Sequence, residues 1–115
     1  MRLSEAVRRA DMMRPNTVPD QAKRDWLMQL ESEFAEMMEE ELTLLTEQDD
    51  PELLMPSPHD VVYHMYLAPF IDMYQEEMEL WQMDSINANQ AVDEAKAWYR
   101  RNNQKETPLI KGVFI

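Results

Sequence analysis

Apolar residues in the first forty positions recur every three or four residues, which is the period of an amphipathic helix. The first such stretch ends before Pro15, because proline disfavours helix in the residue that precedes it; it contains Leu3, Ala6, Val7, Ala10 and Met13. A second helix is predicted from about Pro19 to about Leu42, with Thr17 as its N-cap. Its apolar stripe consists of Trp26, Leu27, Leu30, Phe34, Met37 and Met38.

A third helix is predicted from about Pro58 to Met83, with Ser57 as its N-cap and Asp60 in its first turn. Because Pro69 removes one backbone hydrogen bond inside this long helix, we expect a bend at that point. The helix carries a wide apolar stripe, which consists of Val62, Tyr63, Tyr66, Leu67, Phe70, Met73, Tyr74, Met78 and Trp81.

A fourth helix is predicted from an Asp84–Ser85 cap to about Asn102. Arg100 and Arg101 suit the negative end of its dipole. The inner face, where small residues allow a close approach to the third helix, consists of Ala88, Val92, Ala95 and Tyr99.

The pattern therefore predicts an all-α fold, a small bundle of about four helices with a kinked long third helix. We assign residues 1–102 to this helical domain and residues 103–115 to an extended apolar tail. A chain of 115 residues has the length of one domain. Its single Gly argues against an all-β fold rich in tight turns.

Composition narrows the possible functions. A net charge of −12 argues against general nucleic-acid binding and against adhesion to an anionic membrane. The absence of Cys rules out disulfides, thiolate catalysis and Cys-based metal sites. No segment approaches the roughly 18–20 apolar residues of a membrane span, and the first residues lack the apolar run of a signal peptide. We therefore expect a protein that is made in the cytoplasm.

The charges are segregated along the chain. The window 25–95 holds 19 of the 23 acidic residues and no Lys or Arg, so that all 11 basic residues lie near one end or the other. Opposite fields attract and fix the register of an interface. This layout favours an assembly in which the ends of one copy meet the middle of the next.

Titratable clusters give little support for catalysis or metal binding. His59 and His64 are five residues apart and do not share a helix face as a metal pair would. The acidic stretches lack the alternating ligands and the Gly turn of a calcium loop, and a solvated acidic surface is the simpler interpretation; they contain Glu36, Glu39, Glu40, Glu41, Asp49, Asp50 and Glu52. We predict no enzymatic activity, no metal and no cofactor.

Glu77 projects onto the apolar stripe of the predicted third helix, where a carboxylate is costly unless it is paired. Two interpretations stay open. Glu77 is either an acid with a raised pKa in a pocket, or a residue near the helix end that reaches water or pairs with Lys96 or Arg100.

The C-terminal tail is the least ordinary segment, since five of its last seven residues are large and apolar: Leu109, Ile110, Val113, Phe114 and Ile115. The tail either packs on its own bundle or docks on another subunit as an added strand or plug, and the charge layout favours docking. The predicted partner interface joins this tail to Arg8, Arg9, Arg100 and Arg101. The acids expected to face a neighbour or a lumen are Glu36, Glu39, Glu40, Asp49 and Asp50.

Three stretches resemble the head–tail connector, or adaptor, proteins of tailed bacteriophages and prophages. The first has a Pro-Asn turn followed by a Trp-Leu helix, RPNTVPDQAKRDWLMQLE. The second has a Pro-x-Asp cap before a Tyr-rich helix, LLMPSPHDVVYHMYLAPFIDMYQEE. The third is a closing helix with an aromatic and basic end, NANQAVDEAKAWYRR. Together they cover most of Met13–Arg101.

The resemblance implies a structural virion protein at the head–tail junction, assembled in the host cytoplasm. Copies of such a protein form a homo-oligomeric ring of about twelve subunits between the portal protein and the next tail-side component. DNA passes through the lumen without specific binding, and acidic side chains on the wall would repel it. The alternative is a small acidic regulatory protein that binds a basic cytoplasmic partner by phosphate mimicry.

Overall fold

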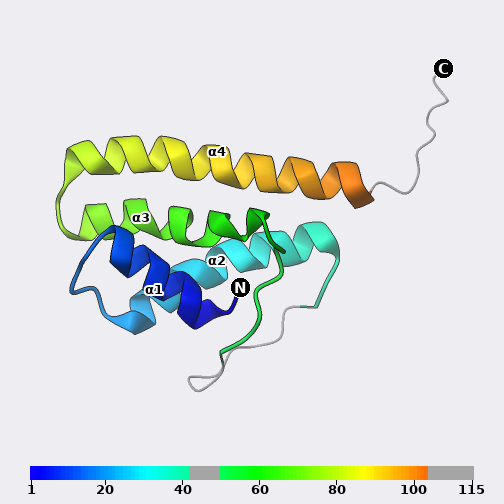
Figure 1. The fold of residues 1–115 in the computed structure, drawn as a ribbon, viewed down its shortest axis with the longest axis horizontal. Helices are drawn as coiled ribbons and strands as arrows, with labels where there is room; N and C mark the ends of the chain where they lie inside the picture. The colour runs from blue at the N-terminus through cyan, green and yellow to red at the C-terminus, as the bar shows by residue number, and fades with distance from the viewer. Residues whose placement is uncertain (42–49, 104–115) are drawn as a thin grey trace.

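The computed structural model describes residues 1–41 and 50–103, which form four α-helices and no β-strand (Figure 1). Helix α1 spans Leu3–Met13, α2 spans Asp20–Met38, α3 spans Val62–Tyr74 and α4 spans Met78–Asn103. A short 3₁₀ helix, η1 (His59–Val61), leads into α3. The predicted all-α class and the number of helices are confirmed. Beyond Asn103, the predicted tail lies outside the described residues.

Helix α3 is the centre of the domain, because α1, α2 and α4 all pack against it (Figure 1). Its sequence suits this position, since it is apolar on several sides and buries Val62, Tyr63, Leu67, Ala68, Pro69, Ile71 and Asp72. The other helices each contribute one buried stripe. Their largest core residues are Leu3 and Val7 from α1, and Leu27, Leu30 and Phe34 from α2.

Helices α2 and α3 end in the same way. Each continues into a Glu with a left-handed backbone, Glu39 with φ 57° and Glu76 with φ 60°. The following amide of each donates back across the last turn, from Glu40 to the Ala35 carbonyl and from Glu77 to the Asp72 carbonyl, both at 2.9 Å. This is a Schellman ending, in which Gly is the usual left-handed residue. With a single Gly in the chain, Glu occupies both positions.

These endings correct three predicted boundaries. The second helix ends at Met38 instead of Leu42. The predicted third helix ends at Tyr74, and its last predicted residues belong to α4, because the chain turns between Tyr74 and Met78. The predicted Asp84–Ser85 cap lies inside α4. Apolar periodicity continues through the turn, so that the pattern alone does not reveal it. Pro69 lies inside α3 as predicted, and the bend at Pro69 stays a prediction.

The predicted side-chain caps are also wrong. The N-cap positions of α2 and α3 are Pro19 and Val61, and neither makes a side-chain cap hydrogen bond. Thr17 and Ser57 are exposed. The turn before α2 is instead organised by Asn16, whose side-chain oxygen accepts the Val18 amide at 2.9 Å.

A segment distant in sequence closes the start of α1. The Asp50 carboxylate accepts hydrogen bonds from the Ser4 amide at 2.8 Å and from the Ser4 hydroxyl at 2.7 Å. The Pro51 carbonyl accepts the Leu3 amide at 3.0 Å. These contacts satisfy amides that a helix cannot pair internally. They also lower the pKa of Asp50, chiefly through the hydrogen bond from the Ser4 side chain.

Candidate functional site

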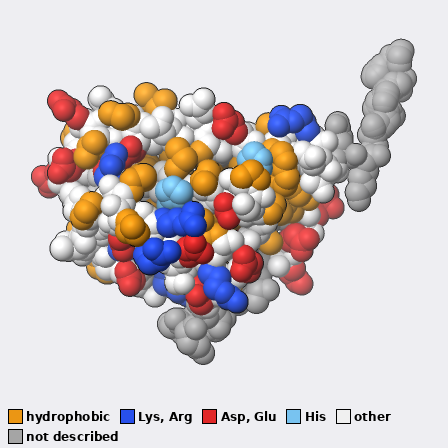
Figure 2. All heavy atoms as spheres, in the orientation of Figure 1, with side chains coloured by type: hydrophobic (Ala, Val, Ile, Leu, Met, Phe, Trp, Pro, Cys, Tyr) orange, Lys and Arg blue, Asp and Glu red, His pale blue; other side chains and the backbone are white. Residues whose placement is uncertain are grey.

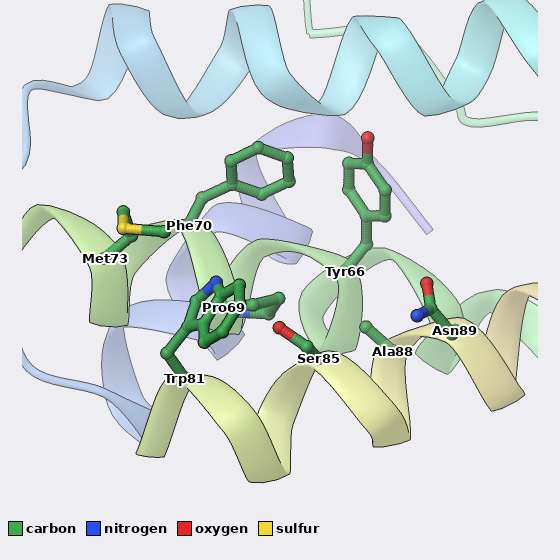
Figure 3. Close-up of a pocket in the computed structure, with 8 residues that line it drawn as sticks. All are labelled: Tyr66, Pro69, Phe70, Met73, Trp81, Ser85, Ala88 and Asn89. Atoms are coloured by element: carbon green, nitrogen blue, oxygen red, sulfur yellow. The ribbon is translucent and has the colours of Figure 1, made fainter. Parts of the chain in front are cut away.

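An apolar groove of about 600 Å³ lies between α3 and α4. Figure 3 shows α3 as its floor, with aromatic rings rising toward α2 and side chains of α4 pointing toward Pro69 from the other side. The lining residues are Tyr66, Pro69, Phe70, Met73, Trp81, Ser85, Ala88 and Asn89. Volume and lining match those of sites that bind apolar groups with a few polar contacts. We refer to this feature as the α3–α4 groove.

Helix α2 packs against an aromatic residue that lines the groove. Trp26 stacks on Phe70 with ring centroids 5.0 Å apart, and Tyr66 lies 5.1 Å from the same ring. Such offset aromatic contacts hold the rings in a fixed arrangement. Toward the C-terminal end of α4, the Lys96 ammonium bonds the Glu33 carboxylate at 2.9 Å and connects α4 to α2. This ion pair lies about two helical turns beyond Asn89.

Helix α4 also has an apolar outer surface. Met83 is 57% exposed and Ile86 is 67% exposed. They are two and five residues from Trp81, and at 100° per residue this spacing places them on the side of α4 that faces away from the groove. Figure 2 shows apolar side chains at the surface along α4. Large apolar side chains on two faces of one helix are typical of helices that contact other subunits.

A buried charge cluster joins three helices near the α3–α4 turn. Arg14, directly after α1, donates to both oxygens of Asp84 in α4, at 2.9 and 3.0 Å. Asp72 in α3 is fully buried, and its carboxylate lies 3.5 Å from the Arg14 Nε without a hydrogen bond to it. One guanidinium therefore faces two buried carboxyl groups. Because its single positive charge balances only one carboxylate, the other carboxyl group is suited to keep its proton.

The pKa of Asp72 is raised to about 7. Burial is the main cause, and the neighbouring Asp84 carboxyl adds to it as a hydrogen-bond partner and as a negative charge. Arg14 acts in the opposite direction. Below neutral pH, Asp72 therefore keeps its proton and acts as a neutral donor toward Asp84.

A second buried carboxylate connects α2 to the start of α3. Glu31 accepts the Tyr63 hydroxyl at 2.7 Å and the Leu54 amide at 2.7 Å, and the Tyr63 oxygen accepts the Met55 amide at 2.8 Å. Burial raises the pKa of Glu31, while these hydrogen bonds partly offset the effect. These hydrogen bonds connect α2 to the segment that leads into α3.

The structure corrects the interpretation of the charge layout. Several basic residues near the chain ends already contact the acidic window of their own chain: Arg14 pairs with Asp72 and Asp84, and Lys96 pairs with Glu33. Figure 2 shows acidic and basic side chains next to one another on the face that carries α1. The layout is therefore satisfied in part within one subunit and does not by itself require a neighbour.

The predicted interface residues fall in different places. Arg8 and Arg9 are exposed on α1 and both approach Glu5 one turn away. Arg100 and Arg101 are exposed in the last turn of α4, as predicted. The apolar tail residues Leu109, Ile110, Val113, Phe114 and Ile115 lie outside the described residues.

The predicted acidic surface is found in part. Glu36, Glu39 and Glu40 are exposed at the end of α2. The Asp50 carboxylate accepts hydrogen bonds from Ser4 at the start of α1, and its role toward a neighbour stays a prediction. Asp49 lies outside the described residues.

Glu77 and the histidines are structural in this fold. Glu77 is exposed in the turn between α3 and α4, where its carbonyl accepts the Trp81 amide at 2.9 Å, so the interpretation of a helix-end residue that reaches water holds. His59 packs on Trp98 with centroids 4.6 Å apart. The buried Nδ1 of His64 has no hydrogen-bond partner, and burial lowers the pKa of this side chain. Within residues 1–41 and 50–103, no three His, Asp or Glu side chains are grouped as a metal site.

Pattern analysis missed the groove and the buried charge cluster. The helical wheel treats the aromatic residues of α3 as one stripe, whereas Phe70 stacks on Trp26 of α2 and Tyr66 points toward α2, which leaves a space beside α4 (Figure 3). The sequence does contain a sign of the buried charge cluster. Asp72 follows Ala68, which is buried, by four residues, so that both lie on the same face of α3.

Comparisons with protein-family models, with curated proteins and with solved structures gave no match. Within the described part of the chain, no helix has the combination of length and apolar character needed to cross a membrane.

Proposed function

We propose that this protein is a structural subunit that assembles with other protein subunits, and specifically a head–tail connector of a tailed bacteriophage. The observation that supports an assembly role is the apolar surface of α4. It lines the α3–α4 groove on one side and exposes Met83 and Ile86 on the other. A soluble monomer gains nothing from such surface, whereas a ring subunit must contact two neighbours through two different patches.

The connector assignment rests on the resemblance of the three stretches to that family. The exposed acidic residues at the end of α2 are consistent with this assignment. Glu36, Glu39 and Glu40 lie together and exposed at the end of α2, where in a ring they would form part of a negative lumen wall. Such a wall repels DNA and prevents it from binding as it passes.

Light scattering and negative-stain imaging test the proposal. The purified chain is examined alone and after mixing with portal rings of the phage or prophage that encodes it. We expect rings of the chain itself, or portal rings that carry an added layer with one copy per portal subunit. A chain that stays monomeric and leaves portal rings unchanged would exclude the proposal.

The same experiment distinguishes the acidic-regulator alternative. A phosphate mimic is expected to form a one-to-one complex with a basic protein, and this complex should dissociate at roughly 0.5–1 M salt because exposed ion pairs are then screened. An assembly held by apolar surface should persist at that salt concentration.

A further inference from the structure

The α3–α4 groove presents apolar surface that a stable assembly should cover. Its walls are aromatic and its floor includes Met73, which is 47% exposed. Met adapts its shape to a partner at little cost. The polar groups along the groove are the Ser85 hydroxyl and the Asn89 amide, both from α4 (Figure 3). This combination fits a short apolar peptide whose backbone needs a few hydrogen bonds.

The chain itself contains such a peptide. The segment Leu109–Ile115 has five large apolar residues in seven and one basic residue, Lys111. We propose that the α3–α4 groove of one copy binds the segment Leu109–Ile115 of a second copy. This inference rests on the proposed assembly role and names the contact that would build it.

Chain length favours a second copy over the same chain. Along α4 the groove extends from Asn89 to Trp81, which at 1.5 Å per residue lies about 21–33 Å from Asn103. Fully extended, the chain from Asn103 carries Leu109 about 20–22 Å and Lys111 about 26–29 Å. In its own subunit Leu109 therefore reaches only the near end of the groove, and Lys111 falls short of Glu79 at the far end, about 36 Å from Asn103. A neighbouring copy can deliver all seven residues.

An ion pair obstructs the intramolecular path as well. The contact between Lys96 and Glu33, at 2.9 Å, joins α4 to α2 between Asn103 and the groove. A chain that ran back over α3 from Asn103 would have to cross or break it. A peptide from another copy can enter from the opposite end, at the α3–α4 turn.

Charge at that open end suits the segment. The turn and the first residues of α4 present the exposed carboxylates Glu76, Glu77 and Glu79. Lys111 has the opposite sign, which would favour the entry and orientation of the segment. Groove and segment are different surfaces of the same chain, so the contact is head-to-tail and repeats from copy to copy until a ring closes.

Two variants test the contact by complementation. One ends at Pro108 and keeps the groove, and the other carries Ser85→Arg in the groove and keeps the segment. Each alone should fail to form rings, because it lacks one half of the groove–segment contact. Mixed, they should form a one-to-one complex through the single intact groove and the single intact segment. The matched control is Gln82→Arg, which adds the same charge at an exposed position of α4 outside the groove lining. It should assemble like the wild type.

Circular dichroism checks that Ser85→Arg retains its helix content. If it does not, Met73→Glu replaces it, because this lining residue is half exposed and tolerates a charge more readily. A wild-type chain that assembles while both variants also assemble would refute the groove contact and leave the proposed function intact. Variants that stay monomeric but melt earlier than a monomeric wild type would show that the segment binds its own subunit, which also overturns the proposal.

A peptide experiment tests the groove independently of ring formation. A synthetic peptide with the sequence PLIKGVFI is titrated into the chain that ends at Pro108, and binding is followed by tryptophan fluorescence, to which the groove residue Trp81 contributes. We expect saturable binding that Ser85→Arg weakens by at least about tenfold and Gln82→Arg leaves unchanged. Absence of binding refutes the inference. Binding by a chain that forms no ring and no portal complex would support the inference and reject the proposed function.

Discussion

Single residues decide how this acidic chain tolerates charge in its interior. Arg14 satisfies Asp84 with two hydrogen bonds and leaves Asp72 with an ion pair at 3.5 Å. Burial of a charged carboxylate without hydrogen-bond donors costs free energy. A carboxyl group that keeps its proton avoids this cost, because it stays neutral. Asp72 is therefore buried in its protonated, neutral form, whereas the carboxylates at the end of α2 are exposed.

Asp72 should make the domain less stable as the pH rises. Its pKa is about 7 in the folded protein, well above the ordinary aspartate value of 3.8. Between these values the unfolded chain releases the proton while the folded protein retains it, so the free energy of unfolding falls as pH increases from about 4 to about 7. The contribution is on the order of 2–4 kcal/mol.

Urea unfolding of the wild type and of Asp72→Asn at several pH values measures this effect. The amide of Asn can donate to Asp84 at any pH, so the variant should gain stability relative to the wild type over that range. The difference between the two curves removes the contributions of Glu31 and His64, which both proteins share. If the unfolding free energies of the two proteins change in parallel with pH, Asp72 does not titrate between about pH 4 and 7.

At the scale of elements, the ends of the helices differ most from what the sequence pattern predicts. Periodicity locates the apolar faces correctly, but α2 and α3 end where no Gly or Pro marks a stop. Backbone hydrogen bonds across the last turn define both ends. Any residue can make these bonds if it accepts a left-handed backbone, which costs a non-Gly residue roughly 1–2 kcal/mol.

Glu76→Gly should therefore stabilise the protein. Gly adopts φ near 60° without the steric cost of a Cβ, and its larger unfolded-state entropy offsets part of the gain, so we expect an increase of about 0.5–1 kcal/mol. Urea denaturation followed by circular dichroism measures it. Glu94→Gly, at an exposed position inside α4, is the matched control and should lower stability by about 1 kcal/mol. Destabilisation by both substitutions would contradict the assigned role of Glu76.

At the scale of the whole molecule, the four helices are not equally anchored. Helix α3 is enclosed by three partners, whereas α4 packs mainly on α3 and buries only Asp84, Ala88 and Ala95. Small side chains bury little apolar area, so less free energy holds α4 in place than holds α1 and α2. Weaker anchoring suits a helix that lines a binding groove, because such a helix can adjust its position when a partner binds.

Native-state hydrogen exchange should detect this difference. Amides 86–94 of α4 are expected to exchange through an opening of lower free energy than amides 66–68, 70 and 71 of α3, which should require global unfolding. Ala95→Gly should lower the opening free energy of α4 further, since it removes a buried methyl group and adds backbone entropy. Equal free energies for both helices would show that the domain unfolds as one cooperative unit.

The sequence by itself determined the all-α class, the number of helices, most of the core residues and the presence of an unusual apolar segment at the C-terminus. These properties follow from periodicity and composition, which are local. Only the tertiary structure decided the break between Tyr74 and Met78, the contact of Asp50 with Ser4, the pairing of Arg14 with Asp84 and the groove beside Trp81. Each of these depends on which surfaces meet across tens of residues. A helical wheel records the face on which a side chain lies, but not the partner that the face contacts.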